Sequence, residues 1–318
     1  MTKVVFIYNG GEQVKQTFLY EQKSGCEVVC LPVEANAAEK EAALQDAEIL
    51  VLMPAQISDE LLQKAKKLKL VQVLSAGYDK INLELCRNKG IIVANNGGAN
   101  SDSVAVHSVA MLLAMYRRIL DCDAAIRQGE WRKPVQEFTQ FELAGKTVGI
   151  MGAGHIGSKV AQYYHGLDAR IIYYAHSSHK DLEENYNAKK VELDELVTTA
   201  DIISIHLPLL PSTKGLLGAR EFAMMKANMV LVNTGRAEIV DTAALIEALA
   251  YKRIAGACLD VFTEEPLAED SELLHLENVL LSPHMAGHSA EGWVRRARNA
   301  WTNIELMAQG KDIRWQVK

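Results

Sequence analysis

The sharpest chemical signal in the sequence is a glycine-rich segment at residues 152–157, which reads GAGHIG. It follows a short apolar run at 147–151 and opens a helix-like stretch that continues to Tyr164. In a strand-turn-helix unit, the first glycine of such a motif permits a tight turn, the second lets a pyrophosphate approach the backbone, and the third lets helix and strand pack closely. Free N–H groups at the start of the helix then bind the anion. The alternative is a glycine-rich turn that binds nothing. The dinucleotide contacts that the motif predicts are Gly152, Gly154, His155, Ile156 and Gly157.

Several further short blocks follow a fixed order along the chain. They read LSAGYD at 74–79, GEW at 129–131, HLPL at 206–209, NTGRA at 233–237, DVFTEEP at 260–266 and SPH at 282–284. In order and spacing, and together with the glycine segment, these blocks resemble the D-isomer-specific 2-hydroxyacid dehydrogenases over about residues 70 to 292. The resemblance implies an α/β fold with two Rossmann-like parallel-sheet domains. It also implies that the cofactor domain is inserted into a discontinuous, flavodoxin-like substrate domain.

The chemistry of such an enzyme indicates what Arg236, Glu265 and His284 could do. Hydride transfer to the carbonyl of a 2-oxo acid develops negative charge on oxygen, so the site needs a proton donor and a cation for the substrate carboxylate. We expect His284 to donate the proton, Glu265 to orient its imidazole and favour the protonated form, and Arg236 to clamp the carboxylate and the carbonyl. The alternatives are a loop histidine, a solvated acid and an arginine that caps a turn. By resemblance Glu265, beside Pro266, is the catalytic acid, and we expect Glu264 to face solvent.

The resemblance also implies contacts for the substrate and for the rest of the cofactor. The backbone N–H groups of Ser75, Ala76 and Gly77 are expected to hold the substrate carboxylate, because a glycine-containing turn can bind an anion. A plain strand-to-helix turn is the alternative. Asp260 is expected to hold the nicotinamide amide, with Thr234 nearby, or else to cap the next segment. The remaining cofactor contacts are assigned to His206, Pro208 and Thr213.

The residues after the predicted strand at 171–174 bear on which nicotinamide dinucleotide is bound. In NAD-binding Rossmann units an Asp or Glu about 20 residues after the glycine motif accepts hydrogen bonds from the ribose 2′-hydroxyl and repels a 2′-phosphate. Here that position is Ala175, 23 residues after Gly152. Hydroxyls, imidazoles and an ammonium follow, and they can donate to phosphate oxygens. We therefore expect NADP(H) to be preferred, with NAD(H) as the alternative. The residues assigned to this contact are His176, Ser177, Ser178 and Lys180.

Two series of short apolar runs must supply the strands that position these residues. The first lies at 4–8, 27–30, 49–53, 70–74 and 91–94, and the second at 147–151, 171–174, 201–205, 229–233, 255–259 and 279–281. Continuous apolarity over four or five residues is typical of parallel strands that are covered on both faces. We therefore expect two parallel-sheet domains. Residues 1–98 with 290–318 form the substrate domain, and residues 99–289 form the cofactor domain.

Two long helical stretches lie near these boundaries. Residues 101–127 read as a helical stretch that is apolar on most of its surface from 104 to 120. It needs a second partner surface, so we expect a homodimer; burial within the chain alone is the alternative. The last helix, 290–308, repeats large apolar residues on one face and is expected to dock on the first domain. Val106 stands where family members commonly have Glu, so a polar interaction is missing there.

Composition limits the class of protein and its partners. The 318 residues fit two domains. A net charge of -6, with no long block of either sign, argues against nucleic acid or an anionic membrane as a partner. The five scattered cysteines, with no C-x2-C spacing, argue against a disulfide framework or a zinc site and favour a cytoplasmic location. The strongest apolar run is far short of the ~20 residues that span a bilayer.

Sequence and resemblance together predict a nicotinamide-dependent reductase of a small 2-oxo acid. Glyoxylate or hydroxypyruvate is the favoured substrate type, and the corresponding 2-hydroxy acid is the product. Two alternatives are a catalytically weak protein that senses a dinucleotide, and a same-fold dehydrogenase of another substrate such as formate or phosphite. Consumption of reduced cofactor with a panel of 2-oxo acids separates them.

Overall fold

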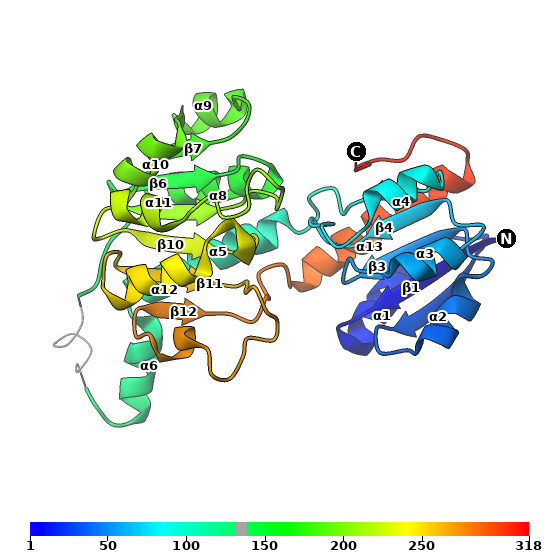
Figure 1. Ribbon diagram of the computed structural model, residues 1–318, viewed down its shortest axis with the longest axis horizontal. Coiled ribbons are helices and arrows are strands. Elements are labelled where there is room, and N and C mark those ends of the chain that lie inside the picture. Colours follow the sequence, from blue (N-terminus) through cyan, green and yellow to red (C-terminus); the bar gives the residue numbers. More distant parts are fainter. Residues whose placement is uncertain (132–138, 318) are drawn as a thin grey trace. The chain divides into compact units, whose positions relative to one another are not determined.

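A computed structural model describes residues 1–131 and 139–317, and its internal contacts divide the chain into two compact units. One unit comprises Met1–Asn100 and His288–Lys318, and the other comprises Ser101–Gly287. In the described residues, each unit is built on a parallel sheet with helices against it (Figure 1). The α/β fold class predicted from the sequence is therefore confirmed.

The first unit contains a five-stranded sheet in the order β2-β1-β3-β4-β5, and all of its strand pairs are parallel. Leu50, Val51 and Leu52 on the central strand are fully buried, which explains why this strand reads as an unbroken apolar run. Helices α1 and α13 pack on one face, and α2, α3 and α4 pack on the other. The strands are β1 (Thr2–Tyr8), β2 (Cys26–Pro32), β3 (Ile49–Met53), β4 (Leu70–Val73) and β5 (Ile92–Ala94). The helices are α1 (Gly11–Tyr20), α2 (Ala37–Leu44), α3 (Asp59–Lys64), α4 (Leu83–Asn88) and α13 (Ala290–Ala308).

Helix α13 has the bounds that its apolar repeat predicts. Its first turn is capped by the hydroxyl of Ser289, which accepts a hydrogen bond from the N–H of Gly292. Trp301 is fully buried in the first unit, and its indole N–H donates to the carbonyl of Phe18 at 2.8 Å. The end of the chain thus packs on helix α1 near its beginning, and both segments belong to the first unit.

The second unit contains a seven-stranded parallel sheet in the order β12-β11-β10-β9-β6-β7-β8. Six of these strands lie at the apolar runs of the sequence. The seventh, β8, was missed because it consists of Lys189 and Lys190 alone, at the edge of the sheet, where no apolar run is needed. The strands are β6 (Thr147–Met151), β7 (Arg170–Tyr174), β8 (Lys189–Lys190), β9 (Ile202–Ile205), β10 (Val230–Asn233), β11 (Gly256–Leu259) and β12 (Val279–Leu281).

Helices cover both faces of this sheet. Side chains of α5, α8 and α9 pack on one face, and side chains of α10, α11 and α12 pack on the other. The chain runs from β6 to one edge through β7 and β8, and then to the other edge through β9 to β12. Strand order therefore reverses between β6 and β9, and their carboxyl ends form the crevice where ligands bind in open α/β sheets. The helices are α5 (Ser101–Tyr116), α6 (Ile119–Arg127), α8 (His155–His165), α9 (Lys180–Tyr186), α10 (Leu193–Thr199), α11 (Ala219–Met224) and α12 (Thr242–Ala250), with short 3-10 turns η1 (Ala237–Ile239) and η2 (Glu272–His275).

The helical stretch expected at residues 101–127 is two helices rather than one. Helix α5 ends at Tyr116, and Arg118 adopts a left-handed conformation with φ 51° before α6 begins at Ile119. The two axes differ by 59°. A left-handed residue ends a helix, and an arginine at that position gives no sign of it in the sequence. Within the described residues no single helix has the length and hydropathy of a membrane span, and α5 and α6 meet that test only as a bent pair.

Candidate active site

The three residues predicted to do chemistry follow three neighbouring strands. Arg236 comes after β10, Glu265 after β11 and His284 after β12, and these strands are adjacent and parallel. Their carboxyl ends therefore lie along one edge of the sheet, where an open α/β sheet binds its ligands.

His284 and Glu265 form the closest pair of this group. Nδ1 of the imidazole lies 2.8 and 3.0 Å from the two carboxylate oxygens of Glu265. The carboxylate is itself held by the N–H of Phe262 at 3.1 Å. Because an ionised carboxylate only accepts hydrogen bonds, Nδ1 carries a proton, and Nε2 is the nitrogen left to act on another molecule. The side chains of His284 and Glu265 are 48% and 37% exposed, so a small ligand can reach them.

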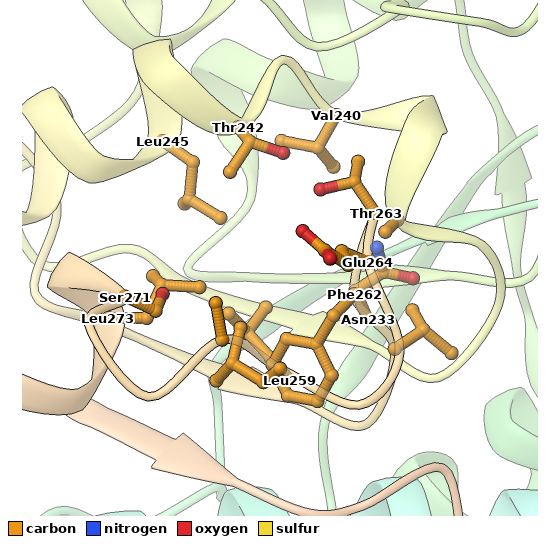
Figure 2. Close-up of a pocket in the computed structure, with 14 residues that line it drawn as sticks. Asn233, Val240, Thr242, Leu245, Leu259, Phe262, Thr263, Glu264, Ser271 and Leu273 are labelled. Carbon is orange, nitrogen blue, oxygen red and sulfur yellow. The ribbon is translucent and has the colours of Figure 1, made fainter.

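Glu264, next to Glu265, points elsewhere. It lines a pocket of about 190 Å³ between the turn after β10 and the loop after β11. Figure 2 shows its carboxylate directed into this pocket, near Thr263 and Thr242. Glu264 is exposed, as expected, but it faces this pocket rather than open surface. The two neighbouring acids thus have different surroundings, and only Glu265 holds the imidazole.

Asp260 organises the turn that carries His284. It is fully buried, and its Oδ1 accepts hydrogen bonds from the Ser282 hydroxyl and from the N–H of Met285, at 2.5 and 2.8 Å. Its Oδ2 accepts from the N–H of Ala286 at 2.9 Å. This geometry gives Asp260 a structural role in the segment after β12, not in the segment that follows Asp260 in the chain. Its contact with a nicotinamide amide stays a prediction.

Arg236 lies on a turn that is held by its own backbone and by Asn233. The side-chain amide of Asn233 accepts from the N–H of Gly235 and donates to the carbonyl of Arg236, both at 3.0 Å. The guanidinium donates to the carbonyl of Gly235 at 2.9 Å. Arg236 is half-buried.

The glycine segment has the geometry of a phosphate cradle. Gly152 has φ 96°, and a Cβ there would lie 2.7 Å from the backbone of His206. A Cβ on Gly157 would lie 1.9 Å from the carbonyl oxygen of Gly152, so the strand and helix could not approach as they do. Gly154 has open space around its Cβ position at the start of the 11-residue helix α8. The strand, turn and helix therefore fit the pyrophosphate of a dinucleotide, as the motif predicts.

The loop after β9 lies beside this cradle because β9 and β6 are paired. His206 Nε2 is 2.8 Å from the hydroxyl of Ser204, and burial lowers the pKa of this imidazole to about 3. His206 is therefore neutral over the ordinary pH range. The hydroxyl of Thr213 donates to the carbonyl of Pro208 at 2.7 Å and accepts from the N–H of Leu210, which fixes the turn between them.

The residues after β7 are mostly exposed and carry no acid at the strand end. His176, Ser177, Ser178 and Lys180 are exposed, and half-buried Glu183 accepts a hydrogen bond from the hydroxyl of Tyr173. A further cation, Lys190 on β8, donates to the carbonyl of His176 at 3.2 Å. The sequence analysis missed Lys190 because the two-residue strand β8 carries no pattern that would place it beside β7.

The predicted substrate loop belongs to the first unit. It follows β4, and the hydroxyl of Ser75 donates to the carbonyl of Gly77 at 2.7 Å. The side-chain amide of Asn95 donates to the carbonyl of Ala76, and the N–H of Asn96 donates to the carbonyl of Ser75. These contacts hold the loop through its carbonyl oxygens.

Cys258 packs rather than reacts. It is fully buried on β11 with its Sγ 3.8 Å from the sulfur of Met115, and burial raises the pKa of its thiol well above the ordinary value. All five cysteines are free thiols. Within the described residues no group of three His, Cys, Asp or Glu side chains is placed to hold a metal ion.

Comparison with known proteins decides the family. The model of the D-isomer specific 2-hydroxyacid dehydrogenase NAD binding domain matches residues 109–286, more than half of the chain. The chain belongs to the D-isomer-specific 2-hydroxyacid dehydrogenase family. The resemblance seen in its sequence blocks is thereby confirmed, and the matched residues cover the whole sheet of the second unit.

Proteins similar to this chain differ in the substrates that their names give. The chain is 39% identical to glyoxylate reductase of Aeropyrum pernix over 269 residues, which are 83% of this chain and 80% of that protein. An acyclic imino acid reductase in complex with NADPH and D-Arg has 27% identity and a TM-score of 0.86, over 100% of both chains. D-lactate dehydrogenase of Lactobacillus jensenii, with NAD+, has 28% identity and a TM-score of 0.80, over 99% of both chains. The family is thus clear, whereas the named substrates and the bound cofactors differ among these similar proteins.

Proposed function

We propose that this protein reduces a small 2-oxo acid of the glyoxylate or hydroxypyruvate type to the 2-hydroxy acid. The observation that carries the proposal is the pairing of His284 Nδ1 with both oxygens of Glu265, which leaves Nε2 free of that carboxylate. Similarity to glyoxylate reductase supports the substrate type. A bound dihydronicotinamide supplies the hydride.

Each residue of the proposed site has one task. His284 Nε2 gives a proton to the carbonyl oxygen as negative charge develops there. Glu265 orients the ring and stabilises the imidazolium. Arg236 holds the substrate carboxylate with two parallel N–H donors, which a lysine cannot reproduce. That the N–H groups of Ser75, Ala76 and Gly77 also donate to that carboxylate stays a prediction from the resemblance.

A substrate screen tests this proposal. Purified protein is mixed with NADPH or NADH and a panel that contains glyoxylate, hydroxypyruvate, pyruvate and formate, and cofactor absorbance is followed. We expect the highest kcat/KM with glyoxylate or hydroxypyruvate. A protein that binds the cofactor but never consumes it would instead be a dinucleotide sensor, and selective oxidation of formate would point to a different dehydrogenase.

We further propose that NADPH is preferred over NADH. Ala175 stands where an acid would bind the ribose 2′-hydroxyl, and the nearest half-buried acid, Glu183, accepts a hydrogen bond from Tyr173. The exposed side chains of His176, Ser177, Ser178 and Lys180 can donate, and Lys190, which donates to the carbonyl of His176, adds a second ammonium to this region. Steady-state kcat/KM with both cofactors tests the preference, and Ala175→Asp should shift it toward NADH. Equal values for the wild-type protein would contradict it.

We also propose a homodimer in the reducing cytoplasm. The exposed large apolar residues of α5, α6 and the segment after them support a partner surface, and the five free thiols fit a reducing compartment. Light scattering at micromolar concentration should give twice the chain mass of 35.1 kDa. A monomer mass would contradict the dimer. The exposed apolar residues of this proposed partner surface are Val106, Ile119, Leu120, Ile126 and Trp131.

A further inference from the structure

Two adjacent residues of helix α5 contact the two loops that carry the proposed catalytic residues. His107 Nε2 lies 3.0 Å from the hydroxyl of Ser282, two residues before His284. The hydroxyl of Ser108 lies 2.8 Å from that of Thr234, two residues before Arg236. Successive residues of a helix project about 100° apart, so one turn of α5 can reach both loops.

The hydrogen-bond direction is fixed in the contact made by His107. The Ser282 hydroxyl has one hydrogen, and it is donated to the buried carboxylate of Asp260. The hydroxyl therefore accepts from His107, whose Nε2 must carry a hydrogen. The same Nε2 lies 3.6 Å from Oδ1 of Asp260. A chain of donors thus runs from α5 through Ser282 to Asp260.

Asp260 carries this chain onward to the turn of His284. Its two oxygens accept from the N–H groups of Met285 and Ala286, the two residues directly after His284. His284 itself has φ 55°, a left-handed conformation that a non-glycine residue adopts only when its surroundings impose it. The turn is therefore held on both sides of His284, by Ser282 before it and by residues 285 and 286 after it.

The contact made by Ser108 also has a fixed direction. The hydroxyl of Ser108 donates to the carbonyl of Val104 one turn back on α5, at 2.8 Å. Thr234 is therefore the donor to Ser108. Ser108 is fully buried and Thr234 is nearly so, which leaves little room for water to replace either partner. This pair ties the start of the Arg236 turn to α5.

We propose that His107 and Ser108 are positioning residues, which set the turns of His284 and Arg236 respectively. The proposal rests on the proposed function, in which those two residues act on the 2-oxo acid. It gives α5 a role in catalysis that acts through these two turns. Proton donation depends on His107, and carboxylate binding depends on Ser108.

The kinetic test uses one pair of variants at His107 and one variant at Ser108. His107→Leu should lower kcat for 2-oxo acid reduction by about 10- to 100-fold with little change in substrate KM, because the donor is displaced from its attack geometry. His107→Gln keeps an N–H donor at the end of the side chain and should recover most of the loss. Ser108→Ala should instead raise the substrate KM. Ala110→Gln, at an exposed position of the same helix, is the matched control and should match the wild-type protein.

A double variant separates positioning from general loss of stability. In a His284→Gln background, His107→Leu should cause little further loss of kcat, because there is no donor left to misplace. A full additional loss would overturn the proposal. If His107→Leu does not fold, Ser282→Ala breaks the same chain of donors and is used in its place.

Amide hydrogen exchange gives a readout that does not depend on turnover. His107→Leu should speed exchange in residues 282–286 by about 10-fold or more, while residues 234–236 keep their wild-type rates; Ser108→Ala should do the reverse. Unchanged exchange at both segments would overturn the proposal. A wild-type protein that reduces no 2-oxo acid, but whose variants show the selective exchange, would refute the proposed function while leaving this arrangement of α5 supported.

Discussion

Glu264 and Glu265 are neighbours in the chain, yet only Glu265 holds the imidazole of His284. Nδ1 of His284 lies 2.8 and 3.0 Å from its two carboxylate oxygens, whereas the Glu264 carboxylate points into the pocket shown in Figure 2. Both side chains are exposed, so burial does not distinguish them. Because the two carboxylates point in different directions, substituting each acid in turn gives a matched pair of variants that tests the contact with His284.

Glu265→Gln should lower kcat for 2-oxo acid reduction strongly, and Glu264→Gln should not. The substitution removes the negative charge that stabilises the imidazolium. It also replaces one carboxylate oxygen with an NH2 group, which cannot accept the hydrogen bond from Nδ1 that fixes the ring. We expect a loss of about 10²-fold or more for Glu265→Gln, the lower end for loss of general acid catalysis. Initial rates at saturating cofactor measure both variants. Equal losses in the two would remove the orienting role from Glu265.

His284→Gln should remove the pH dependence that proton donation causes. Only the protonated imidazole can donate, so kcat for reduction in the wild-type protein should fall as pH rises, and kcat for oxidation of the 2-hydroxy acid should rise. The variant should lose about 10²- to 10⁴-fold in reduction and show flat profiles in both directions. A variant with near wild-type kcat would show that another group donates the proton. Cofactor binding, followed by fluorescence, should be retained and serves as the control for folding.

Much of the second unit could be predicted from the sequence because its strands are buried on both faces. Ile150, Ile203 and Val232 are fully buried, and such positions strongly favour apolar side chains. The cradle could be predicted for a different reason. Close approach at Gly152 and Gly157 excludes any Cβ, so glycine is required there and the spacing becomes visible.

What escaped prediction depends on contacts between residues far apart in the chain. Nothing local in the sequence indicates that His107 meets Ser282, 175 residues later, or that both oxygens of Asp260 hold the next turn. The end of helix α5 before Arg118 could not be predicted either, because no local sequence pattern marks an arginine that adopts a left-handed conformation. Strand β8 was missed because an edge strand of two lysines gains nothing from apolar side chains.

The lysines of β8 provide a test of the cofactor site that does not require turnover. Lys189 pairs with Glu195 at 2.6 Å, whereas Lys190 donates to the carbonyl of His176. Successive strand residues point to opposite faces, so only Lys190 is on the side of the loop after β7. Lys190→Met should raise the Kd of 2′,5′-ADP by about 10-fold or more, the loss of one charge-assisted hydrogen bond, with little effect on 5′-AMP.

Lys189→Met is the matched control, and calorimetric titration of both ligands measures the effect. We expect its Kd values to equal those of the wild-type protein. If Lys190→Met weakens both ligands alike, the ammonium supports the loop rather than the phosphate. If wild-type protein binds 2′,5′-ADP no better than 5′-AMP, the NADPH preference itself is contradicted.

His206 should make the folded protein less stable in mild acid. Burial lowers the pKa of its imidazole from 6.5 to about 3. Below pH 6.5 this imidazole is protonated in the unfolded chain, whereas in the folded chain it is protonated only near pH 3. The free energy of unfolding therefore falls as pH falls between these two values. Between pH 6.5 and 5 this group removes about 2 kcal/mol, at 1.36 kcal/mol for each pH unit.

His206→Asn removes this titration and isolates the effect from that of other acidic groups. At pH 7 the variant should be less stable than the wild-type protein, because it loses the packing of the ring. The difference in the free energy of unfolding between the two proteins should shrink by about 2 kcal/mol between pH 6.5 and 5. Only the wild-type protein has a buried imidazole that stays neutral when folded and takes up a proton when unfolded, so only its stability falls over this range. Urea unfolding followed by circular dichroism measures it, and His275→Asn, at an exposed position, is the control. If the free energies of unfolding of His206→Asn and the wild-type protein change in parallel over this pH range, then burial does not keep His206 neutral.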